Sequence, residues 1–406
     1  MLFVEMELAK EHRELVDRIA RQNGFTDYEI ITTSGSNKGD NFLGILTAIT
    51  IKNKEKSLDV ILKTSETNKQ VRDSTPFRDL YKREIFLYER VFEEFKKFQE
   101  EYNIEDRFES VPKFYLSFTE NELEGFVMEN LKTQQYQMWN KKVPINPGHT
   151  KAVLIEYAKF HAVALAMKYK NPELFKDLTE RGPPNPYEIS YQGDNEKVEQ
   201  MKALITHSLS DTFKAIKDNV VLIEYLKHYE QNLLPDAMSK LQGPEYKLVI
   251  THGDCWCNNF MFKYQNPNDK TTPQSLRIVD WQMSSFGNPC TDISYFLLAN
   301  GSEEILNDFE TFLKIYHDKL ALQLRNFNLD PNEVFSWSRF QNHLKKSILS
   351  GLFMSLLTIK LMVTEWVPDH VEAVEKSGGS SSLQLEEYSR RVKILLKFLV
   401  KNKYLS

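Results

Sequence analysis

The chain has 406 residues, of which 41% are hydrophobic and 27% charged, with 52 basic and 57 acidic side chains mixed along its length. This composition is that of a soluble globular protein, its length suits one large two-lobed unit or two domains, and without a long basic run we expect no nucleic acid partner. The N-terminus has no apolar signal-like core, no window approaches eighteen uninterrupted apolar residues and only three cysteines occur, so we predict no membrane span, no disulfide framework and a cytoplasmic location.

The first third of the chain alternates between helical and strand-like patterns. Apolar spacing predicts a helix over residues 5–22, and β-rich runs between turn formers predict an antiparallel meander over residues 28–63. Helical spacing returns over residues 76–97, and strands follow in PKFYLSFTE and GFVMENL. These elements predict a small antiparallel sheet accompanied by one long helix.

After Leu131 the pattern is mostly helical. Helical spacing runs over residues 149–168, 197–233, 303–327, 333–362 and 383–399, and strand-like runs interrupt it at 247–250 and 276–280. SGGSSS at 377–382 is expected to be a flexible loop. We therefore predict an α+β fold with a cleft between two lobes, a smaller one of residues 1–131 and a larger, mainly helical one of residues 132–406, together one domain.

The stretch THGDCWCNNF, residues 251–260, concentrates residues that carry chemistry. His252, Asp254, Cys255 and Cys257 are potential zinc ligands, but they crowd into six residues with no second Cys/His pair nearby, unlike a structural zinc site. A cysteine beside a tryptophan in a buried loop is more often an apolar filler than a nucleophile, and no His–Asn partner pattern accompanies it. Phosphate handling has more support than either of these interpretations.

Phosphoryl transfer by a kinase needs an aspartate that orients and deprotonates the acceptor hydroxyl, an asparagine, and a second aspartate that holds Mg²⁺. Asp254 follows an apolar strand, Asn259 lies five residues later, and Asp280 ends the next apolar strand after a polar turn. The Asp-to-Asn spacing equals that of the protein-kinase pattern H-R-D-x-x-x-x-N. A hairpin whose aspartates cap turns would explain HGD alone, but not all three residues in this order.

The first candidate phosphate contact is the turn SGSNKGDN (34–41), which joins two predicted strands. The backbone of Ser36, Asn37, Lys38 and Gly39 is a candidate to cover phosphates, although such a turn is more often a plain hairpin connection. It is not a Walker A loop, because no GK[ST] follows.

Four further residues complete a candidate nucleotide site in the order that a kinase requires. Lys63 ends an apolar strand, and Glu84 lies on the apolar face of the predicted helix, where a glutamate is uncommon unless paired. A strand lysine paired with a helix glutamate aligns the α- and β-phosphates in kinases. In FVMENLK (126–132), the Glu129 carbonyl and the Leu131 N–H are candidates to bind adenine, against the simpler interpretation of a buried strand end.

These motifs resemble the ecdysteroid kinase-like family, relatives of choline kinases and aminoglycoside phosphotransferases. The matching pieces lie between Tyr28 and Leu298 and include ILK, F-x-x-L-Y-K-R-E-x-x-x-Y, FVMENL, KFHAVALA, HGDCWCNNFMF and IVDWQMSSFGNPCTDISYFL. The resemblance implies a protein-kinase-like fold with ATP bound between the lobes.

The resemblance also implies roles for individual residues. Asp254 would be the catalytic base, and Asn259 and Asp280 the Mg²⁺ ligands. Lys63 with Glu84 would place the phosphates. His252 would brace the catalytic loop, and Asp292 would be a structural residue of the larger lobe.

Only eleven residues separate Asp280 from Asp292, which leaves no room for an activation loop and disfavours a protein substrate. We expect a Mg²⁺/ATP-dependent kinase of a hydroxyl on a small lipophilic, steroid-like alcohol, with residues 134–144 and 287–298 as candidate pocket linings. The alternatives are a kinase of choline or a xenobiotic alcohol, although no aromatic and carboxylate box for a choline cation can be located, and a pseudokinase-like ligand-binding protein. Without an extended apolar seam, the chain is expected to be a monomer.

Overall fold

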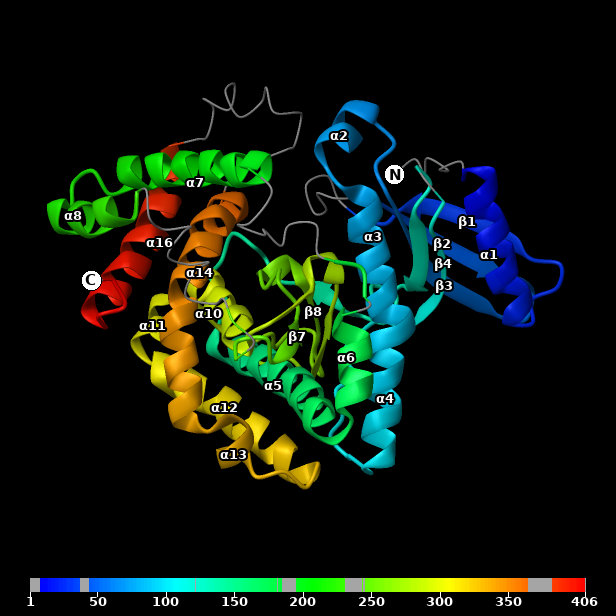
Figure 1. The fold of residues 1–406 in the computed structure, drawn as a ribbon. Coiled ribbons are helices and arrows are strands. Elements are labelled where there is room, and N and C mark those ends of the chain that lie inside the picture. Colours follow the sequence, from blue (N-terminus) through cyan, green and yellow to red (C-terminus); the bar gives the residue numbers. More distant parts are fainter. Residues whose placement is uncertain are drawn as a thin grey trace.

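The computed structural model describes residues 8–36, 44–120, 122–180, 182–184, 195–230, 243, 245–363 and 382–405. They form the two predicted lobes, with a sheet in the N-terminal lobe and a larger, mainly helical C-terminal lobe (Figure 1). Among the described residues, the N-terminal sheet has the antiparallel order β1-β2-β3-β5-β4. Its strands are β1 (Glu29–Ser34), β2 (Ile45–Lys52), β3 (Ser57–Thr64), β4 (Phe114–Phe118) and β5 (Gly125–Glu129).

Helix α1 (Lys10–Gln22) packs on one face of this sheet and forms a hydrophobic cluster with it. Leu15, Val16 and Ile19 of the helix are buried against the strands, as their helical spacing predicts. The predicted start at residue 5 is wrong in its described part, because Leu8 and Ala9 precede the helix. Residues 5–7 lie outside the described part of the chain.

The long helix predicted to accompany the sheet is confirmed over residues 77–97 and continues to Glu101. It comprises α3 (Phe77–Phe86), a π-helical turn (Leu87–Val91) and α4 (Phe92–Glu101), and the short α2 (Lys69–Ser74) precedes it. Its first half packs on the second face of the sheet, where the Tyr88 and Phe126 ring centroids are 5.7 Å apart. Its second half reaches the large lobe, where Phe95 lies 5.9 Å from Phe160.

Helices dominate the larger lobe, and its first one is α5 (Pro147–Lys170), which spans the predicted helix 149–168. The other described helices are α6 (Pro172–Glu180), α7 (Asn195–Ala215), α8 (Val220–Tyr229), α10 (Pro289–Asn300), α11 (Glu303–Asn307), α12 (Phe309–Asn326), α13 (Pro331–Phe335), α14 (Trp337–Val363) and α16 (Ser382–Lys401).

Three predicted helices are each divided in two. The helix expected over 197–233 breaks before Val220, because the Asn219 side chain accepts from Leu222 N–H and starts a new helix. Those expected over 303–327 and 333–362 break at Asp308 and Ser336. Of the loop expected at 377–382, residues 377–381 lie outside the described residues and Ser382 begins α16.

The strands of the larger lobe are short, and three of them lie directly before or after the segments that carry Asp254, Asn259 and Asp280. They are β6 (Gln137–Met138), β7 (Val249–Thr251), β8 (Phe260–Lys263), β9 (Ser275–Ile278) and β10 (Ser285–Gly287). The two predicted strands exist as β7 and β9, but they do not pair with each other: β7 pairs with β10, and β9 pairs with β8. The FMF run proved to be a strand because Phe260 and Phe262 are buried opposite Ile278 and Leu276.

One helical stretch of the described chain, Pro331–Val363, has the length and mean hydropathy of a membrane span. Two thirds of its most apolar window, 67%, is buried inside the protein. Burial of that extent is equally typical of the core helix of a globular protein, and α14 packs directly against α10.

Candidate active site

A cavity between the sheet and the larger lobe brings together most of the predicted site residues. Of those predictions, seven line it: Ser36, Lys63, Glu84, Glu129, Leu131, Asn259 and Asp280. Asn37, Lys38 and Gly39 lie outside the described residues. Asp254 and His252 do not line the cavity, but Asp254 accepts a hydrogen bond from Asn259, which does.

One end of the cavity is an apolar slot beside residues 129–131, the hinge segment that leads from the sheet to the larger lobe. Leu46 and Ile61 line it from the sheet, and Met261 and Val279 line it from the larger lobe. The Leu131 carbonyl accepts from the N–H groups of Gln134 and Tyr136, whereas no acceptor for the Leu131 N–H occurs among the described residues. A flat, apolar ring with one hydrogen-bond acceptor fits such a slot.

The Lys132 side chain connects the hinge to the residue that follows β1. Its Nζ donates to the Gly35 carbonyl at 2.8 Å, just after β1 ends. Both residues line the cavity, so the side chain closes it on the hinge side.

Lys63 lies between two carboxylates at the other end of the cavity. Its Nζ is 2.7 Å from Glu84 Oε2 and 2.6 Å from Asp280 Oδ1, and its side chain is 4% exposed. Burial opposes the charge of Lys63, but Asp280 and Glu84 outweigh burial and raise its pKa above the usual value. The predicted strand–helix pair is therefore formed, and Asp280 joins it.

The backbone at Asp280 directs its carboxylate back into the cavity. Its φ of 65° lies in the left-handed region, which aspartate tolerates better than most residues. The next N–H, that of Trp281, donates to Glu84 Oε1 at 3.2 Å. Glu84 thus holds Lys63 with one oxygen and the segment after Asp280 with the other.

Asp254 is held by three donors. Trp256 Nε1 (3.1 Å) and Asn259 Nδ2 (2.8 Å) donate to its Oδ2, and the Tyr295 hydroxyl donates to its Oδ1 at 3.1 Å. Burial and the charge of Asp280 nevertheless raise the pKa of Asp254 to about 7, although the three hydrogen bonds favour its charged form. A carboxyl group titrating near neutrality suits a general base.

His252 braces the loop that carries Asp254. Its Nδ1 accepts from the Asp254 N–H (3.2 Å), and its Nε2 lies 3.0 Å from the Val279 carbonyl, so the neutral ring with its proton on Nε2 satisfies both contacts. Burial lowers the pKa of His252, which favours this neutral form. The ring thereby ties the Asp254 loop to the residue that precedes Asp280.

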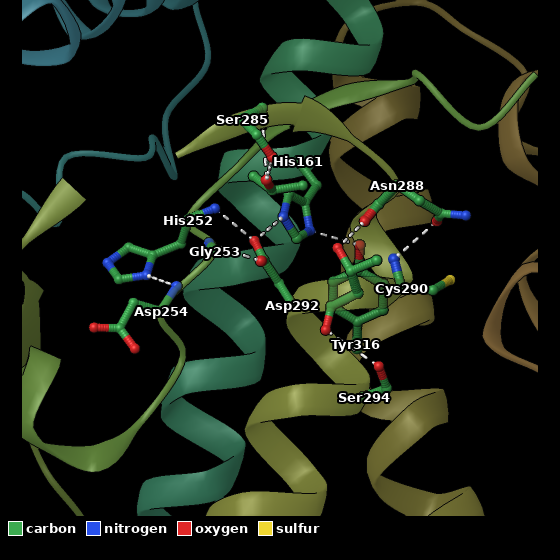
Figure 2. Close-up of polar contacts among 12 residues, drawn as sticks. His161, His252, Gly253, Asp254, Ser285, Asn288, Cys290, Asp292, Ser294 and Tyr316 are labelled. Carbon is green, nitrogen blue, oxygen red and sulfur yellow. Dashed lines mark hydrogen bonds and ion pairs between the residues drawn. The ribbon is translucent and has the colours of Figure 1, made fainter. Parts of the chain in front are cut away.

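Figure 2 shows how Asp292, at the start of α10, fixes the same loop from below. Its Oδ2 accepts from the His252 N–H at 2.7 Å and its Oδ1 from the Gly253 N–H at 3.0 Å. His161 Nε2 lies 3.2 Å from Oδ2, and the other ring nitrogen lies 2.8 Å from the Tyr316 hydroxyl. Burial opposes the charge of Asp292, yet the hydrogen bonds from the His161 side chain and from the His252 backbone help to lower its pKa.

The two cysteines of the loop are buried, as their interpretation as packing residues requires. Cys255 is 0% and Cys257 2% exposed, and both are free thiols. Burial raises the pKa of Cys257 to about 12, which suppresses the reactive thiolate. Across the described residues, no group of three or more His, Cys, Asp or Glu side chains could hold a metal ion.

The sequence interpretation missed several residues that the structure places around the site. Trp256 and Tyr295 contact Asp254, Asn300 holds the backbone of the catalytic loop, and Arg83 ties α3 to the segment after Asp280. Trp256 lies within the quoted motif and could have been considered from its position. The other three act across 41 to 201 residues of sequence, and no local pattern indicates such contacts.

Comparisons with solved structures returned small-molecule phosphotransferases. An aminoglycoside 2'-phosphotransferase-IIIa variant in its GDP complex has a TM-score of 0.44 and 14% identity, covering 97% of this chain and 99% of its own. Plasmodium vivax ethanolamine kinase has a TM-score of 0.43 and 10% identity over 100% of this chain and 93% of its own. A spectinomycin phosphotransferase with ADP and spectinomycin has a TM-score of 0.40 and 9% identity over 95% and 98%.

No curated protein matched the chain in the sequence comparison. The sequence profile of the ecdysteroid kinase-like family matches residues 38–329, which is most of the chain and includes Lys63, Glu84, Asp254, Asn259 and Asp280. The chain therefore belongs to the ecdysteroid kinase-like family.

Proposed function

We propose that the chain is a Mg²⁺- and ATP-dependent kinase that phosphorylates a hydroxyl group of a small lipophilic alcohol of the ecdysteroid type. The observation that carries the proposal is the convergence of Lys63, Asp280 and Asn259 on one cavity, with Asp254 directly behind Asn259. Family membership supports a small-molecule phosphotransferase, and the steroid-like acceptor is the finer part of the proposal.

The donors at the cavity suit a magnesium ion bound together with a nucleotide. Asp280 offers a carboxylate, and Asn259 offers its side-chain carbonyl, because its Nδ2 already donates to Asp254 Oδ2 and to the Asp254 carbonyl. Mg²⁺ prefers oxygen ligands and is commonly held by one or two protein groups together with substrate phosphates. When bound, the ion would neutralise the charge on the transferred phosphoryl group.

The protein's own groups have separate tasks in this proposal. The apolar slot and the Leu131 N–H bind the adenine, and Lys63, steadied by Glu84, orients the phosphates. Asp254 accepts a hydrogen bond, and then the proton, from the acceptor hydroxyl. Phosphoryl transfer has a loose transition state, so that positioning and charge neutralisation account for most of the acceleration.

The segment after Asp280 supports a small acceptor. Residues 281–283 form a 3₁₀ turn, Ser285–Gly287 pair with β7 as β10, and α10 begins at Pro289. Each part of this segment is thus held within the lobe. It contains no free stretch comparable to the activation loop of a protein kinase.

Two alternatives stay open. A kinase of choline or a xenobiotic alcohol would use the same residues with a different acceptor pocket. A pseudokinase-like protein would bind a hydrophobic ligand without chemistry, but a binder has no physical need for the Lys63–Glu84 pair beside Asp254, Asn259 and Asp280. We further propose a monomeric protein of the cytoplasm.

The decisive experiment incubates the purified protein with ATP, Mg²⁺ and a panel of ecdysteroids, other sterols, choline and xenobiotic alcohols, and detects phosphorylated products by mass spectrometry. We expect a phosphorylated steroid that is absent with Asp254→Asn and with Asp280→Ala. Product from choline or a xenobiotic alone would replace the substrate class and keep the reaction. Tight binding of one panel member without any product or ADP would establish the binding protein instead.

A further inference from the structure

We infer that helix α10 is the template that holds the catalytic loop, residues 252–257, and that Tyr295 and Asn300 on this helix are positioning residues for Asp254. The inference rests on the proposed function, since it concerns the placement of the proposed base. The anchor at Asp292 is a property that the family resemblance already implies. The contacts of Tyr295 and Asn300 are additional anchors, so that α10 holds the loop from its start to its end.

The spacing of the three residues puts them on one side of α10. Tyr295 follows Asp292 by three positions and Asn300 follows it by eight, so successive helical turns present all three to the same neighbour. Asp292 accepts from the N–H groups of His252 and Gly253, at the start of the loop. Tyr295 contacts the side chain of Asp254, in the middle of the loop.

Asn300 holds the end of the loop with both ends of its amide. Its Oδ1 accepts from the Cys257 N–H at 2.8 Å, and its Nδ2 donates to the Cys255 carbonyl at 2.9 Å. The side chain is 2% exposed, so water does not replace these bonds. These two contacts fix the peptide groups on both sides of Trp256, which in turn donates to Asp254.

Tyr295 determines the direction of one Asp254 oxygen. Both donors to Oδ2, Trp256 and Asn259, come from the loop region itself, whereas the Tyr295 hydroxyl donates to Oδ1 from α10. The same hydroxyl lies 2.7 Å from Thr358 Oγ1 of α14, which fixes its own position. The rotation of the carboxylate is therefore set from outside the loop.

The simpler interpretation is that Asn300 only ends its helix and Tyr295 only fills the core. Asn300 is the last residue of α10, and its Nδ2 also donates to the Phe296 carbonyl at 2.8 Å, as a local cap would. That contact explains neither the bond to Cys257 nor the bond to Cys255, which reach back 43 and 45 residues. A core tyrosine likewise has no need to direct its hydroxyl at the carboxylate of Asp254.

The test compares the full-length variants Tyr295→Phe and Asn300→Ala with wild type. Tyr388→Phe is the matched control, because Tyr388 is equally buried at 4% and its hydroxyl bonds a threonine, Thr212, far from the loop.

We expect kcat for the acceptor to fall about 100-fold in Asn300→Ala, since displacement of a reacting group by about 1 Å has that effect. In Tyr295→Phe the expected fall is roughly tenfold, the effect of one hydrogen bond to a charged group. KM for ATP should stay within about twofold of wild type, because neither residue lines the nucleotide cavity.

Amide hydrogen exchange supplies a readout that is independent of turnover. In Asn300→Ala we expect faster exchange over residues 252–257, with unchanged exchange in α5 and in the sheet. Unchanged exchange in the loop together with unchanged kcat would overturn the inference. A rise in the KM for ATP that matches the fall in kcat, or faster exchange throughout the lobe, would show a merely structural role and would overturn it as well.

Failure of the proposed function gives a different result. If wild type has no turnover with any acceptor while Asn300→Ala still loosens the loop alone, the template role of α10 stands and only the assigned chemistry falls. If Asn300→Ala does not fold, Tyr295→Phe decides the question, because it removes one oxygen atom and leaves the ring in place.

Discussion

At the scale of single residues, the position of Asp254 beside Asp280 lowers the stability of the folded protein when this carboxyl group is charged. Three donors favour its charged form, but burial and the nearby Asp280 raise its pKa from the ordinary 3.8 to about 7. As the pH rises from 3.8 to 7, the unfolded chain loses the proton of this carboxyl group before the folded chain does. The stability associated with the raised pKa is therefore complete below pH 3.8 and is lost as the pH passes through about 7.

Replacing Asp254 with asparagine should consequently stabilise the protein free of nucleotide and divalent cations. The asparagine oxygen can still accept from Trp256 and Asn259, and its new Nδ2 can donate to the Tyr295 oxygen, so the local contacts persist. We expect Asp254→Asn to raise the free energy of unfolding at pH 8 by up to about 4 kcal/mol, the equivalent of a shift of about three pKa units. Urea unfolding at pH 8 and pH 5 checks this. The gain should be smaller at pH 5, and a gain that grows towards low pH would contradict the assigned shift.

The site residues that could be predicted from the sequence are those that belong to a short local pattern. Asp254 and Asn259 have a fixed spacing, Asp280 ends a strand, and Glu84 is a charge on an apolar helix face. The roles of Tyr295 and Asn300 were not predicted, because they consist of contacts with a loop about 40 residues earlier. The sequence placed Tyr295 only in a candidate pocket lining, residues 287–298, and predicted no helix there. A single chain carries no sign of such contacts until the fold is known.

At the scale of elements, the sequence predicted the strands of the N-terminal sheet, the antiparallel meander of β1–β3, the strands β7 and β9 and most helices, but not the partners of β7 and β9. KLVI and LRIVD are short apolar runs, and nothing in their period distinguishes pairing with each other from the observed pairing with β10 and β8. Helix breaks were missed where one capping side chain, such as Asn219, outweighs continuous apolar spacing. The placement of α3 likewise depends on a distant contact, made by Arg83.

Arg83 anchors α3 to the segment that follows Asp280. Its Nε donates to the Ser284 carbonyl at 2.9 Å, its Nη1 donates to the Pro183 carbonyl, and the residue is 5% exposed. Arg83→Lys cannot maintain both bonds, because an ammonium group lacks the planar fork of a guanidinium. We expect a loss of about 2 kcal/mol in stability and a roughly tenfold weaker affinity for ADP, since α3 carries Glu84.

Thermal unfolding and titration calorimetry measure these two effects. Arg90→Lys is the matched control, as Arg90 lies further along the same long helix with a side chain 47% exposed and paired with Glu94. Equal effects in the two variants would show that the position of Glu84 does not depend on Arg83.

The crossing of α10 and α14 depends on a glycine. A Cβ built on Gly351 of α14 would lie 2.7 Å from Ser294 Oγ and 2.9 Å from the Ser294 backbone carbon of α10. Alanine normally gains about 1 kcal/mol over glycine inside a helix, but separating two packed helices costs about 1–3 kcal/mol. We expect Gly351→Ala to lower the melting temperature and to reduce kcat, because α10 carries the contacts to the catalytic loop.

Gly287→Ala serves as the control for this change. A Cβ at Gly287 would lie 3.5 Å from Thr251 Cγ2, an ordinary van der Waals distance, and its φ is not in the left-handed region. Its melting temperature should match or exceed that of wild type. If Gly351→Ala is equally stable, the two helices can separate without cost and the close crossing has no structural importance.

At the scale of the whole molecule, beside a small cluster of Leu131, Tyr136 and Met261, two large hydrophobic clusters contain most of the buried apolar side chains that the structure describes. One holds α1 against a face of the sheet, and the other runs from α3 and the opposite face of the sheet through α4 into the larger lobe (Figure 1). The long helix is therefore packed with both lobes, and Phe98 stacks on Phe327 with centroids 5.3 Å apart. The lobe boundary at residue 131 stays a prediction.

Lys63 is a polar link from the sheet to α3 and to the segment that carries Asp280. It projects from β3 to Glu84 on α3 and Asp280 beyond β9, at 2.7 and 2.6 Å.

Binding of ADP and Mg²⁺ should therefore slow amide exchange both at the hinge, residues 129–131, and in β1–β3. In Lys63→Met the hinge should remain protected at saturating nucleotide, because the apolar slot is intact, whereas the added protection of β1–β3 should be lost. Lys52→Met, on β2 with a side chain 42% exposed, removes a cation from the same sheet without reaching the cavity and should behave as wild type. Full protection of β1–β3 in Lys63→Met would mean that the sheet closes on the nucleotide without this lysine, and that the coupling between the lobes lies in the hinge alone.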